Sequence, residues 1–421
     1  MTNTRPPSGA DVPGLPVTRP DSCPFDPDET YSRLRAEAPV TPVRCPAGID
    51  AWLVSRYEDI RSVLTDRRLS SRGAGSMHML PSYDGRDPLP GSMIQLDGGE
   101  HARLRRLLMG EFTVRRMEAL RPYIQRITDE HIDAMLSGAG ADLVRDFALP
   151  IPSLVIFEML GVPYEDQAVF QRDSEVLMGF DADEAARDAA SGRLEGRLGE
   201  LVRQRIAEPR DDLLSRLIAR GDRTEHPLAV AELAALGVLL LVAGHETTAS
   251  MIALSALVLM EDPERRAALQ AALQAAPDTT GSSGTTGSSG AAGRAVDELL
   301  RYLSVIQFGL LRYATEDVTV GGTAVKAGEW LVAAVPSGNR DESVFPDPDT
   351  VDLGRQARTH LSFGFGAHQC IGRQLARIEL EIALTTLLRR IPGLRPVIPS
   401  ARAEFKLNGI VLGLRSMPVV W

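Results

Sequence analysis

The sequence predicts one large domain that is mainly α-helical and carries small β-sheets. Apolar residues recur at helical spacing almost without interruption from Thr30 to Arg390, and the longest apolar stretch, Leu233–Met260, predicts a long central helix. A strand-bearing region, Pro39–Val54, precedes the helices, and a mixed region follows them. A length of 421 residues could hold roughly two or three average domains, but length is only a soft prior. Because the pattern is almost uninterrupted, we expect a single domain over residues 21–421.

The segment Met1–Pro20 is rich in Pro, Thr and Gly and contains no apolar run. It therefore has neither the features of a signal peptide nor those of a membrane anchor, and we expect a disordered lead-in. The chain has three cysteines, Cys23, Cys45 and Cys370, which cannot form a paired disulfide framework. Cysteine usage of this kind is typical of a reducing cytoplasm.

The net charge of −10 argues against nucleic acid as a partner. A different kind of segment interrupts the helical pattern at Pro277–Gly293, where Thr-Thr-Gly-Ser-Ser-Gly occurs twice, at Thr279–Gly284 and Thr285–Gly290. Low-complexity composition of this kind predicts a flexible surface loop between two helices, without chemistry of its own.

Cys370 lies among residues that suit a metal-bound thiolate. Gly364 and Gly366 permit positive φ and a close backbone approach, so the loop before the cysteine can fold tightly under a flat cofactor. Gly372 opens a predicted helix, Ile371–Arg389, whose N-terminal amides and dipole would favour the anionic sulfur. No second cysteine or close ligand pair accompanies it, which argues against zinc and against a disulfide. A single thiolate on a haem iron fits best.

This segment resembles the haem-binding loop of the cytochromes P450, in particular the soluble bacterial type found in actinobacterial secondary metabolism. The resemblance implies a cytochrome P450 fold with haem b held between the central helix and the helix after Cys370. It also implies that Cys370 is the axial ligand, that Phe363 walls off the sulfur and that His368 contacts an acidic group at the haem edge.

The central helix is interrupted by polar residues at its middle, and such an interruption of a buried helix is costly unless function requires it. The interruption, Ala243–Thr248, is similar to the oxygen-activating motif of the family. That resemblance implies that Gly244, beside Ala243, lets the helix open and leaves room for dioxygen. It further implies that Thr247 donates a hydrogen bond to the bound oxygen and that Glu246 relays protons. The alternative for Thr247 is a hydrogen bond to the carbonyl four residues back.

Haem carries two propionates, which call for cationic donors from distant segments. His101 and Arg105 match the family's His-x-x-x-Arg pair, Arg312 matches a third contact and His368 a fourth.

Glu298 and Arg301 are spaced i, i+3 on a predicted helix, a spacing that usually marks a weak surface pair. The resemblance instead assigns them, with Arg355, to a buried ion network that fixes the scaffold behind the haem.

The resemblance also places a substrate pocket among mostly apolar residues, which predicts a sizeable hydrophobic substrate such as a polyketide or macrolide, a terpenoid or a steroid-like molecule. The expected lining residues are Met77, Met79, Met93, Met178, Leu240, Val305, Ile306, Phe308 and Ile410.

Nothing after Cys370 in this sequence looks like a flavin or iron-sulfur module, so the electrons must come from outside the chain. We expect them to come from NAD(P)H through a ferredoxin and a ferredoxin reductase. Charge suggests that an acidic ferredoxin docks near Arg103, Arg106, Arg373 and Arg377. We expect a cytoplasmic monomer that hydroxylates or epoxidises its substrate with O2. The alternatives are a peroxide-driven haem-thiolate oxidase and a haem-binding sensor or carrier without turnover.

Overall fold

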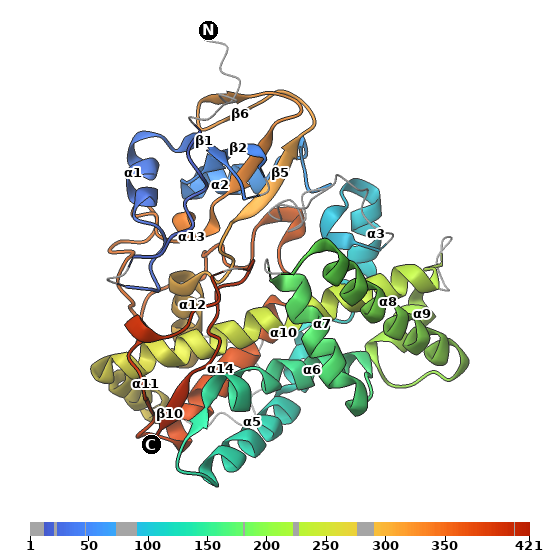
Figure 1. Ribbon diagram of the computed structural model, residues 1–421, viewed down its shortest axis with the longest axis vertical. Coiled ribbons are helices and arrows are strands. Elements are labelled where there is room, and N and C mark those ends of the chain that lie inside the picture. Colours follow the sequence, from blue (N-terminus) through green and yellow to red (C-terminus); the bar gives the residue numbers. More distant parts are fainter. Residues whose placement is uncertain are drawn as a thin grey trace.

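The computed structural model describes residues 12–20, 23–46, 48–72, 91–179, 182–221, 227–275, 290–407 and 409–421. Helices form most of the fold around α10 (Val230–Glu261), which crosses its middle (Figure 1). Every residue from Thr248 to Met260 is buried, so this half of α10 is hydrophobic all round because protein surrounds it. The predicted mainly α-helical domain with small sheets is confirmed.

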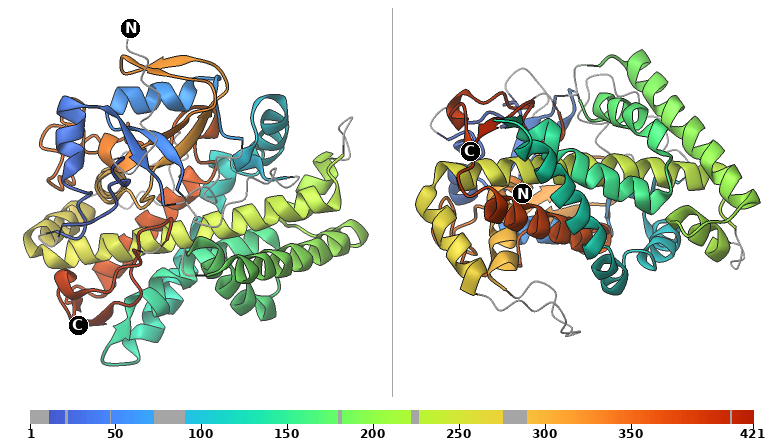
Figure 2. Two further views of the ribbon diagram at one scale, coloured as in Figure 1. Left: turned by 45° about the horizontal axis from the view of Figure 1, so that its top comes forward. Right: turned by 90° about the horizontal axis from the view of Figure 1, so that it is seen from below.

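Two helices beside one another matter most for the site. Figure 2 shows α10 as one long rod with α14 (Arg373–Arg390) alongside it. α10 starts where the amide of Ala229 donates to Glu232 Oε2 at 2.9 Å, which satisfies one of the free N–H groups at the helix start. The other helices are α1 (Thr30–Glu37), α2 (Tyr57–Thr65), α3 (Gly98–Met109), α4 (Val114–Ala119), α5 (Arg121–Leu136), α6 (Pro150–Leu160), α7 (Gln167–Met178), α8 (Glu184–Ala207), α9 (Leu213–Gly221), α11 (Pro263–Ala275), α12 (Ala291–Leu303) and α13 (Val335–Gly338).

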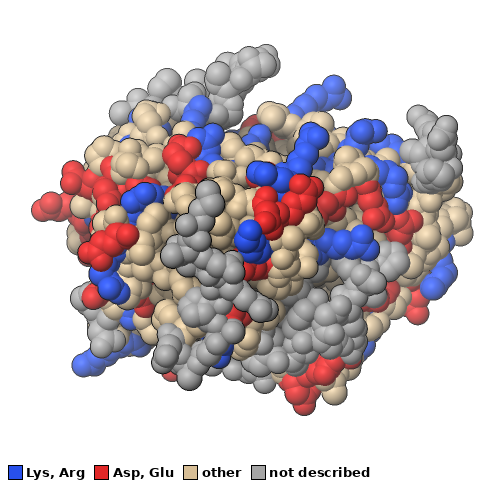
Figure 3. Space-filling model, turned by 90° about the horizontal axis from the view of Figure 1, so that it is seen from above, with Lys and Arg blue, Asp and Glu red and all other residues tan. Residues whose placement is uncertain are grey.

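A five-stranded sheet lies at one end of the molecule, in the order β1-β2-β8-β5-β3. Its strands β2 and β8 are parallel, with Trp52 opposite Leu331, and the other pairs are antiparallel. The strands are β1 (Val40–Arg44), β2 (Asp50–Val54), β3 (Leu69–Ser70), β5 (Leu310–Ala314) and β8 (Trp330–Ala333); the smaller sheets are built from β4 (Ala141–Asp142), β10 (Pro418–Val420) and β9 (Arg395–Pro396), and from β6 (Val318–Val320) and β7 (Thr323–Val325). On the face seen from above, acidic and basic side chains are interspersed (Figure 3).

The N-terminal segment is more ordered than predicted. Leu15 is buried, its amide donates to the Arg44 carbonyl at 2.9 Å, and the Arg44 amide donates to the Pro13 carbonyl at 2.8 Å. The expectation of disorder is therefore wrong for this part of residues 1–20, because β1 supplies free backbone groups at its edge. Residues 1–11 lie outside the described part.

The predicted loop at Pro277–Gly293 ends earlier than expected, because α12 already begins at Ala291. Residues 276–289 lie outside the described part.

Among the described residues, α10 is the one helix long and apolar enough to cross a membrane by length and composition. Only 44% of its most apolar window is buried inside the protein, whereas the half from Thr248 to Met260 is buried throughout and contributes to the main core.

Candidate active site

A cavity of about 300 Å³ lies between α10 and the start of α14. Cys370 and Gly372 line one wall, and Ala243, Gly244 and Thr247 of α10 line the opposite wall. The two sequence motifs, which are more than 120 residues apart, thus face each other across one space.

The loop before Cys370 folds as the glycines predict. Gly364 and Gly366 have φ values of +66° and +73°, in the left-handed region that favours glycine. A Cβ on Gly366 would lie 2.6 Å from the carbonyl oxygen of Leu64, so this position also requires a close backbone approach. The Cys370 amide donates to the Phe363 carbonyl at 2.8 Å, which closes the loop.

The Cys370 side chain is exposed within the cavity, yet the protein atoms around it still desolvate it. This burial raises the pKa of the Cys370 thiol. Opposing it, the amide of Gly372 donates a hydrogen bond to the sulfur, and the Arg105 and Arg373 guanidinium groups and the Arg373 amide also lower the pKa. α14 begins at Arg373, two residues later than predicted, so the amides of its N-cap and of its first residue are the ones that point at the sulfur.

His101 and His368 come from α3 and from the loop before Cys370, and their rings stack with centroids 4.1 Å apart. Burial lowers the pKa of His101 to about 4. Arg105, one turn along α3, donates to the Gln369 carbonyl at 2.6 Å. Three of the four predicted cationic residues therefore meet at one side of the cavity.

Arg312, the fourth, lies on β5 and is buried. Among the described residues, no carboxylate lies within ion-pair distance of it, and Arg312 Nη1 donates to the Leu311 carbonyl at 2.7 Å. Burial lowers the pKa of Arg312 to about 10, with Asp97 acting in the opposite direction. A buried guanidinium of this kind is well suited to an incoming carboxylate.

Asp97 was missed by sequence reasoning. Its carboxylate lies 3.2 Å from His368 Nε2, accepts from the Ser71 amide at 2.9 Å, and also accepts from the Ser70 hydroxyl. It thus orients His368 from the residue before α3. The usable signal was its position at the start of that helix, four residues before His101.

On the α10 wall, the predicted local opening at Gly244 is not present, because the helix is continuous from Val230 to Glu261. The Thr247 hydroxyl donates to the Ala243 carbonyl at 2.8 Å, which is the backbone alternative. A Cβ on Gly244 would lie 3.4 Å from Ile156, so the missing side chain allows α6 to pack closely. Glu246 does not line the cavity and instead pairs with Lys406.

Glu298, Arg301 and Arg355 form one cluster, as expected. Arg301 donates to both Glu298 oxygens at 2.8 Å, and Arg355 Nε lies 3.1 Å from Glu298 Oε1. Glu298 and Arg301 are fully buried, while Arg355 lies nearer the surface. This pair on α12 is therefore part of the interior and not a weak surface pair.

Comparison with known proteins decides the family. The family model for Cytochrome P450 matches residues 180–391. Cytochrome P450-SU2 of Streptomyces griseolus is 41% identical over 424 residues, with 100% of both chains covered. The chain belongs to the cytochrome P450 family. Nocardicin C N-oxygenase of Nocardia uniformis subsp. tsuyamanensis is 43% identical over 93% of this P450 and 94% of that relative. The crystal structure of CYP105P1 in complex with filipin I has 42% identity and a TM-score of 0.88, and the match covers 98% of this P450 and 99% of that chain.

The P450 is therefore a monooxygenase, and its family binds haem through a cysteine thiolate. Cys370 is the described cysteine that lines the cavity. The described residues fit this group in two respects. One accessible sulfur faces the cavity with N–H donors behind it, and the buried Arg312 has no carboxylate partner of its own among them. His101, Arg105 and His368 stand where a second anionic group can be held.

The expected substrate residues divide into three groups. Met93, Leu240, Val305 and Ile306 line the cavity; Met178, Phe308 and Ile410 do not; Met77 and Met79 lie outside the described residues.

Backbone geometry and core packing explain why these three residues do not line the cavity. The chain bends at Gln307 and Phe308, so Phe308 turns away from Ile306 and packs in a separate core cluster beside the large sheet. The Ile410 amide donates to the Met178 carbonyl at 3.2 Å, and both side chains pack against the main core. The expectation is wrong for these three.

Two of the four arginines expected at a docking surface are already occupied. Arg103 Nη2 lies 2.6 Å from Glu232 Oε1. Arg377 is ion-paired with the buried Asp297, and its side chain is only 15% exposed. Arg106 and Arg373 are exposed. Arg377 is therefore wrong as a docking residue, because a buried carboxylate requires its charge.

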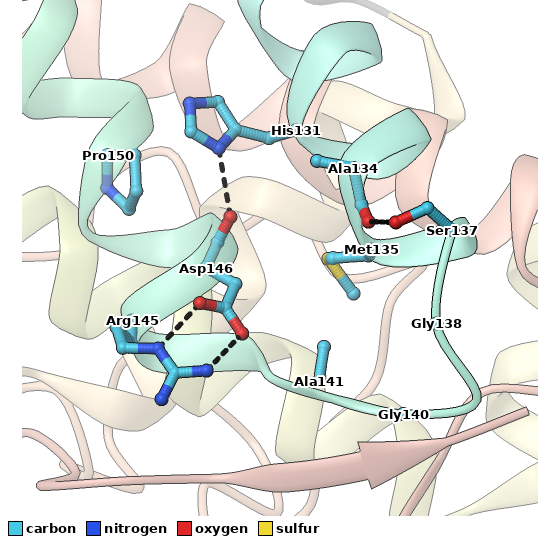
Figure 4. Close-up of a pocket in the computed structure, with 10 residues that line it drawn as sticks. All are labelled: His131, Ala134, Met135, Ser137, Gly138, Gly140, Ala141, Arg145, Asp146 and Pro150. Carbon is cyan, nitrogen blue, oxygen red and sulfur yellow. Dashed lines mark hydrogen bonds and ion pairs between the residues drawn. The ribbon is translucent and has the colours of Figure 1, made fainter.

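A second pocket of about 460 Å³ lies beside the end of α5, β4 and the start of α6 (Figure 4). Its polar groups satisfy one another: His131 Nδ1 lies 2.9 Å from the Asp146 carbonyl, Arg145 pairs with the Asp146 carboxylate, and Ser137 donates to the Ala134 carbonyl. It shares no lining residue with the Cys370 cavity.

Proposed function

We propose that this P450 uses dioxygen and two externally supplied electrons to hydroxylate or epoxidise a sizeable, uncharged hydrophobic secondary metabolite of polyketide, macrolide, terpenoid or steroid type. The observation that carries this proposal is the cavity between Cys370 and α10. On the α10 side, its described polar lining residues are Thr247 and Thr248, and the others there are apolar. A wall of this kind holds a substrate by hydrocarbon contact.

The names of relatives support a substrate in this range. They include a vitamin D3 dihydroxylase from Streptomyces griseolus, CYP105P1 in complex with filipin I, and a mutant of the mixed-function P450 MycG in complex with mycinamicin IV. The cavity residues do not select one of these molecules over another. A screen of such compounds for a substrate-induced spin-state shift is therefore the direct measurement.

When bound, haem would supply oxygen activation, and a cysteine thiolate ligand would favour cleavage of the O–O bond. The proposed task of Thr247 and Glu246 is to deliver protons on the opposite side. For this the Thr247 hydroxyl turns from the Ala243 carbonyl into the cavity that it already lines. The acid and hydroxyl pair is what a peroxide-driven enzyme or a haem carrier without turnover would not require.

For electron supply we propose an acidic ferredoxin, reduced by a ferredoxin reductase, that docks over the ends of α3, α4 and α14. Two large apolar side chains are exposed there, Met109 at 49% and Val114 at 59%. Exposed Arg106, Arg115 and Arg373 lie on the same three helices, and Gln374 donates to Glu118 at 3.3 Å, which joins α14 to α4. An apolar centre within basic residues suits a partner of opposite charge.

Two measurements test the proposal. The reduced, carbon-monoxide-bound protein should show the red-shifted Soret band of a thiolate-bound haem, and its absence in correctly loaded protein would contradict the Cys370 assignment. Turnover with a surrogate ferredoxin, a ferredoxin reductase and NADPH should then yield product from a panel of lipophilic compounds. No product from any of them would favour the carrier, and product with hydrogen peroxide alone would favour the peroxide-driven enzyme.

The docking surface has its own test. Arg106→Glu should slow reduction and weaken its salt dependence, because Arg106 is exposed on the α3 part of this surface. Met109→Ser should also slow reduction, but without changing the salt dependence. An unchanged rate in both variants would place the electron donor elsewhere. We further propose that the protein acts as a cytoplasmic monomer. Size-exclusion chromatography of the purified protein would check the oligomeric state.

A further inference from the structure

Glu246 forms an ion pair with a lysine from a distant part of the chain. Lys406 Nζ lies 3.1 Å from Glu246 Oε1 and 3.5 Å from Glu175 Oε1 of α7. Exposure falls along this row, from 69% for the Glu175 side chain through 24% for Lys406 to 9% for Glu246. The three groups thus lead from solvent to the middle of α10. The sequence contains only one other lysine, Lys326.

The backbone of Lys406 is fixed against the same face of α10. The Lys406 amide donates to the Gly413 carbonyl at 2.8 Å. A Cβ on Gly413 would lie 2.6 Å from Ser250 Oγ, so this turn packs directly onto α10. Ser250 follows Glu246 by four residues and shares its helix face. The ammonium is therefore presented to Glu246 from a rigid support.

The neighbouring histidine does not compete for this role. His245 Nδ1 lies 2.8 Å from the Leu241 carbonyl, and burial lowers the pKa of His245, so the ring is neutral near pH 7. Among the described residues, Lys406 is the one cation in an ion pair with Glu246.

We propose that Lys406 is a positioning residue, which fixes the Glu246 carboxylate at the solvent end of the route towards Thr247. Glu175 holds the other side of the ammonium. This inference rests on the proposed proton-delivery role of Glu246.

The ion pair can be tested without turnover. Reductive methylation of the haem-loaded protein with ¹³C-formaldehyde labels Lys406, Lys326 and the N-terminal amine, so the NMR spectrum contains few signals. Glu246→Gln should shift the Lys406 signal and leave that of Lys326 in place. Glu175→Gln should shift it less, because Glu175 is more exposed and farther away. A Lys406 signal that does not respond to Glu246→Gln would overturn the ion pair.

The positioning role is tested by measuring whether electrons from NADPH end up in product or in hydrogen peroxide. With a surrogate ferredoxin, a ferredoxin reductase and NADPH, one measures the fraction of NADPH electrons recovered as hydrogen peroxide and the solvent deuterium isotope effect on NADPH oxidation. Lys406→Met should raise both, the peroxide fraction by roughly twofold to fivefold, which is the bias that a partly exposed ion pair gives. Lys406→Arg keeps the positive charge and should leave both quantities close to those of the unchanged protein. Lys326→Met is the matched control, since Lys326 pairs with Asp317 at the surface, and it should change neither quantity.

The outcomes separate the two ideas. If Glu246→Gln changes both quantities but Lys406→Met changes neither, the positioning role is wrong and the Glu246 role stands. If Glu246→Gln also changes neither, the proton-delivery role fails and this inference fails with it. The carbon-monoxide spectrum of each variant establishes that its haem remains thiolate-bound, so loss of haem cannot imitate either result.

Discussion

Replacing Arg301 with methionine should lower the free energy of unfolding of the haem-loaded protein by roughly 3–5 kcal/mol. Arg301 is fully buried and donates five hydrogen bonds of 2.8 to 3.1 Å: two to Glu298 and one each to the carbonyls of Asn339, Pro348 and Thr350. At about 1.5–3 kcal/mol for each charged hydrogen bond the simple sum is larger, but the cost of desolvating the guanidinium is also removed. The expected loss is therefore the net value for breaking a buried pair.

The assay is urea unfolding followed by far-UV circular dichroism at fixed haem loading, with the variant compared at equal m-value. Arg355→Met is the matched control: it removes one 3.1 Å contact to Glu298 from a side chain nearer the surface, so about 1–2 kcal/mol is expected. The double variant Arg301→Met with Glu298→Gln should recover part of the loss, because the buried charge of Glu298, which keeps only Arg355 as an ion-pair partner in the single variant, is then removed as well. A loss below about 1 kcal/mol for Arg301→Met, or strictly additive losses in the double variant, would refute the buried-pair reasoning.

Three further predictions follow from other groups. Gly366→Ala should destabilise the protein by more than Gly364→Ala. Both variants lose a positive-φ glycine, which costs about 1–2 kcal/mol, but only Gly366→Ala brings a Cβ to 2.6 Å from a backbone oxygen. Thermal unfolding of the two variants would show the difference. A result in which both lose the same amount would exclude the clash. Burial alone raises the pKa of the Glu379 carboxyl well above its usual range. Above about pH 4.3 the unfolded chain therefore releases a proton that the folded protein keeps, and the free energy of unfolding should fall as pH rises from there. Urea titrations at several pH values should show this slope, and Glu379→Gln should remove it. Burial lowers the pKa of His360 to about 3. Between about pH 6.5 and that value the unfolded chain binds a proton that the folded protein does not bind, so the free energy of unfolding should fall as pH is lowered through this window. The same urea titrations should show that His360→Asn loses less stability in acid.

The Cys370 loop was predictable because its chemistry is local. The positive φ of Gly364 and Gly366 and the amides ahead of α14 follow from residue types a few positions apart. The pairing of Glu298 with Arg301 was likewise set by helical spacing.

The errors occur where distant partners decide. Arg377 is paired with Asp297, and neither residue reveals the other in the sequence. Phe308 leaves the cavity because the chain bends just before it, and Lys406 reaches Glu246 from 160 residues away. The Thr247 hydroxyl donates to the Ala243 carbonyl, and the spacing of the motif alone does not distinguish this bond from one made into the cavity.

If Arg312 holds a propionate, as its resemblance-based role implies, haem takes a part in the folding of this protein. A chain that folds before haem arrives must desolvate this guanidinium against the Leu311 carbonyl, a neutral acceptor. A propionate at Arg312 would offset that cost, and the binding energy of haem would add to the stability of the folded state by mass action. Cells that express the protein faster than they make haem should therefore accumulate chains that unfold and are degraded, whereas supplying a haem precursor should raise the yield of folded protein without any change in its sequence.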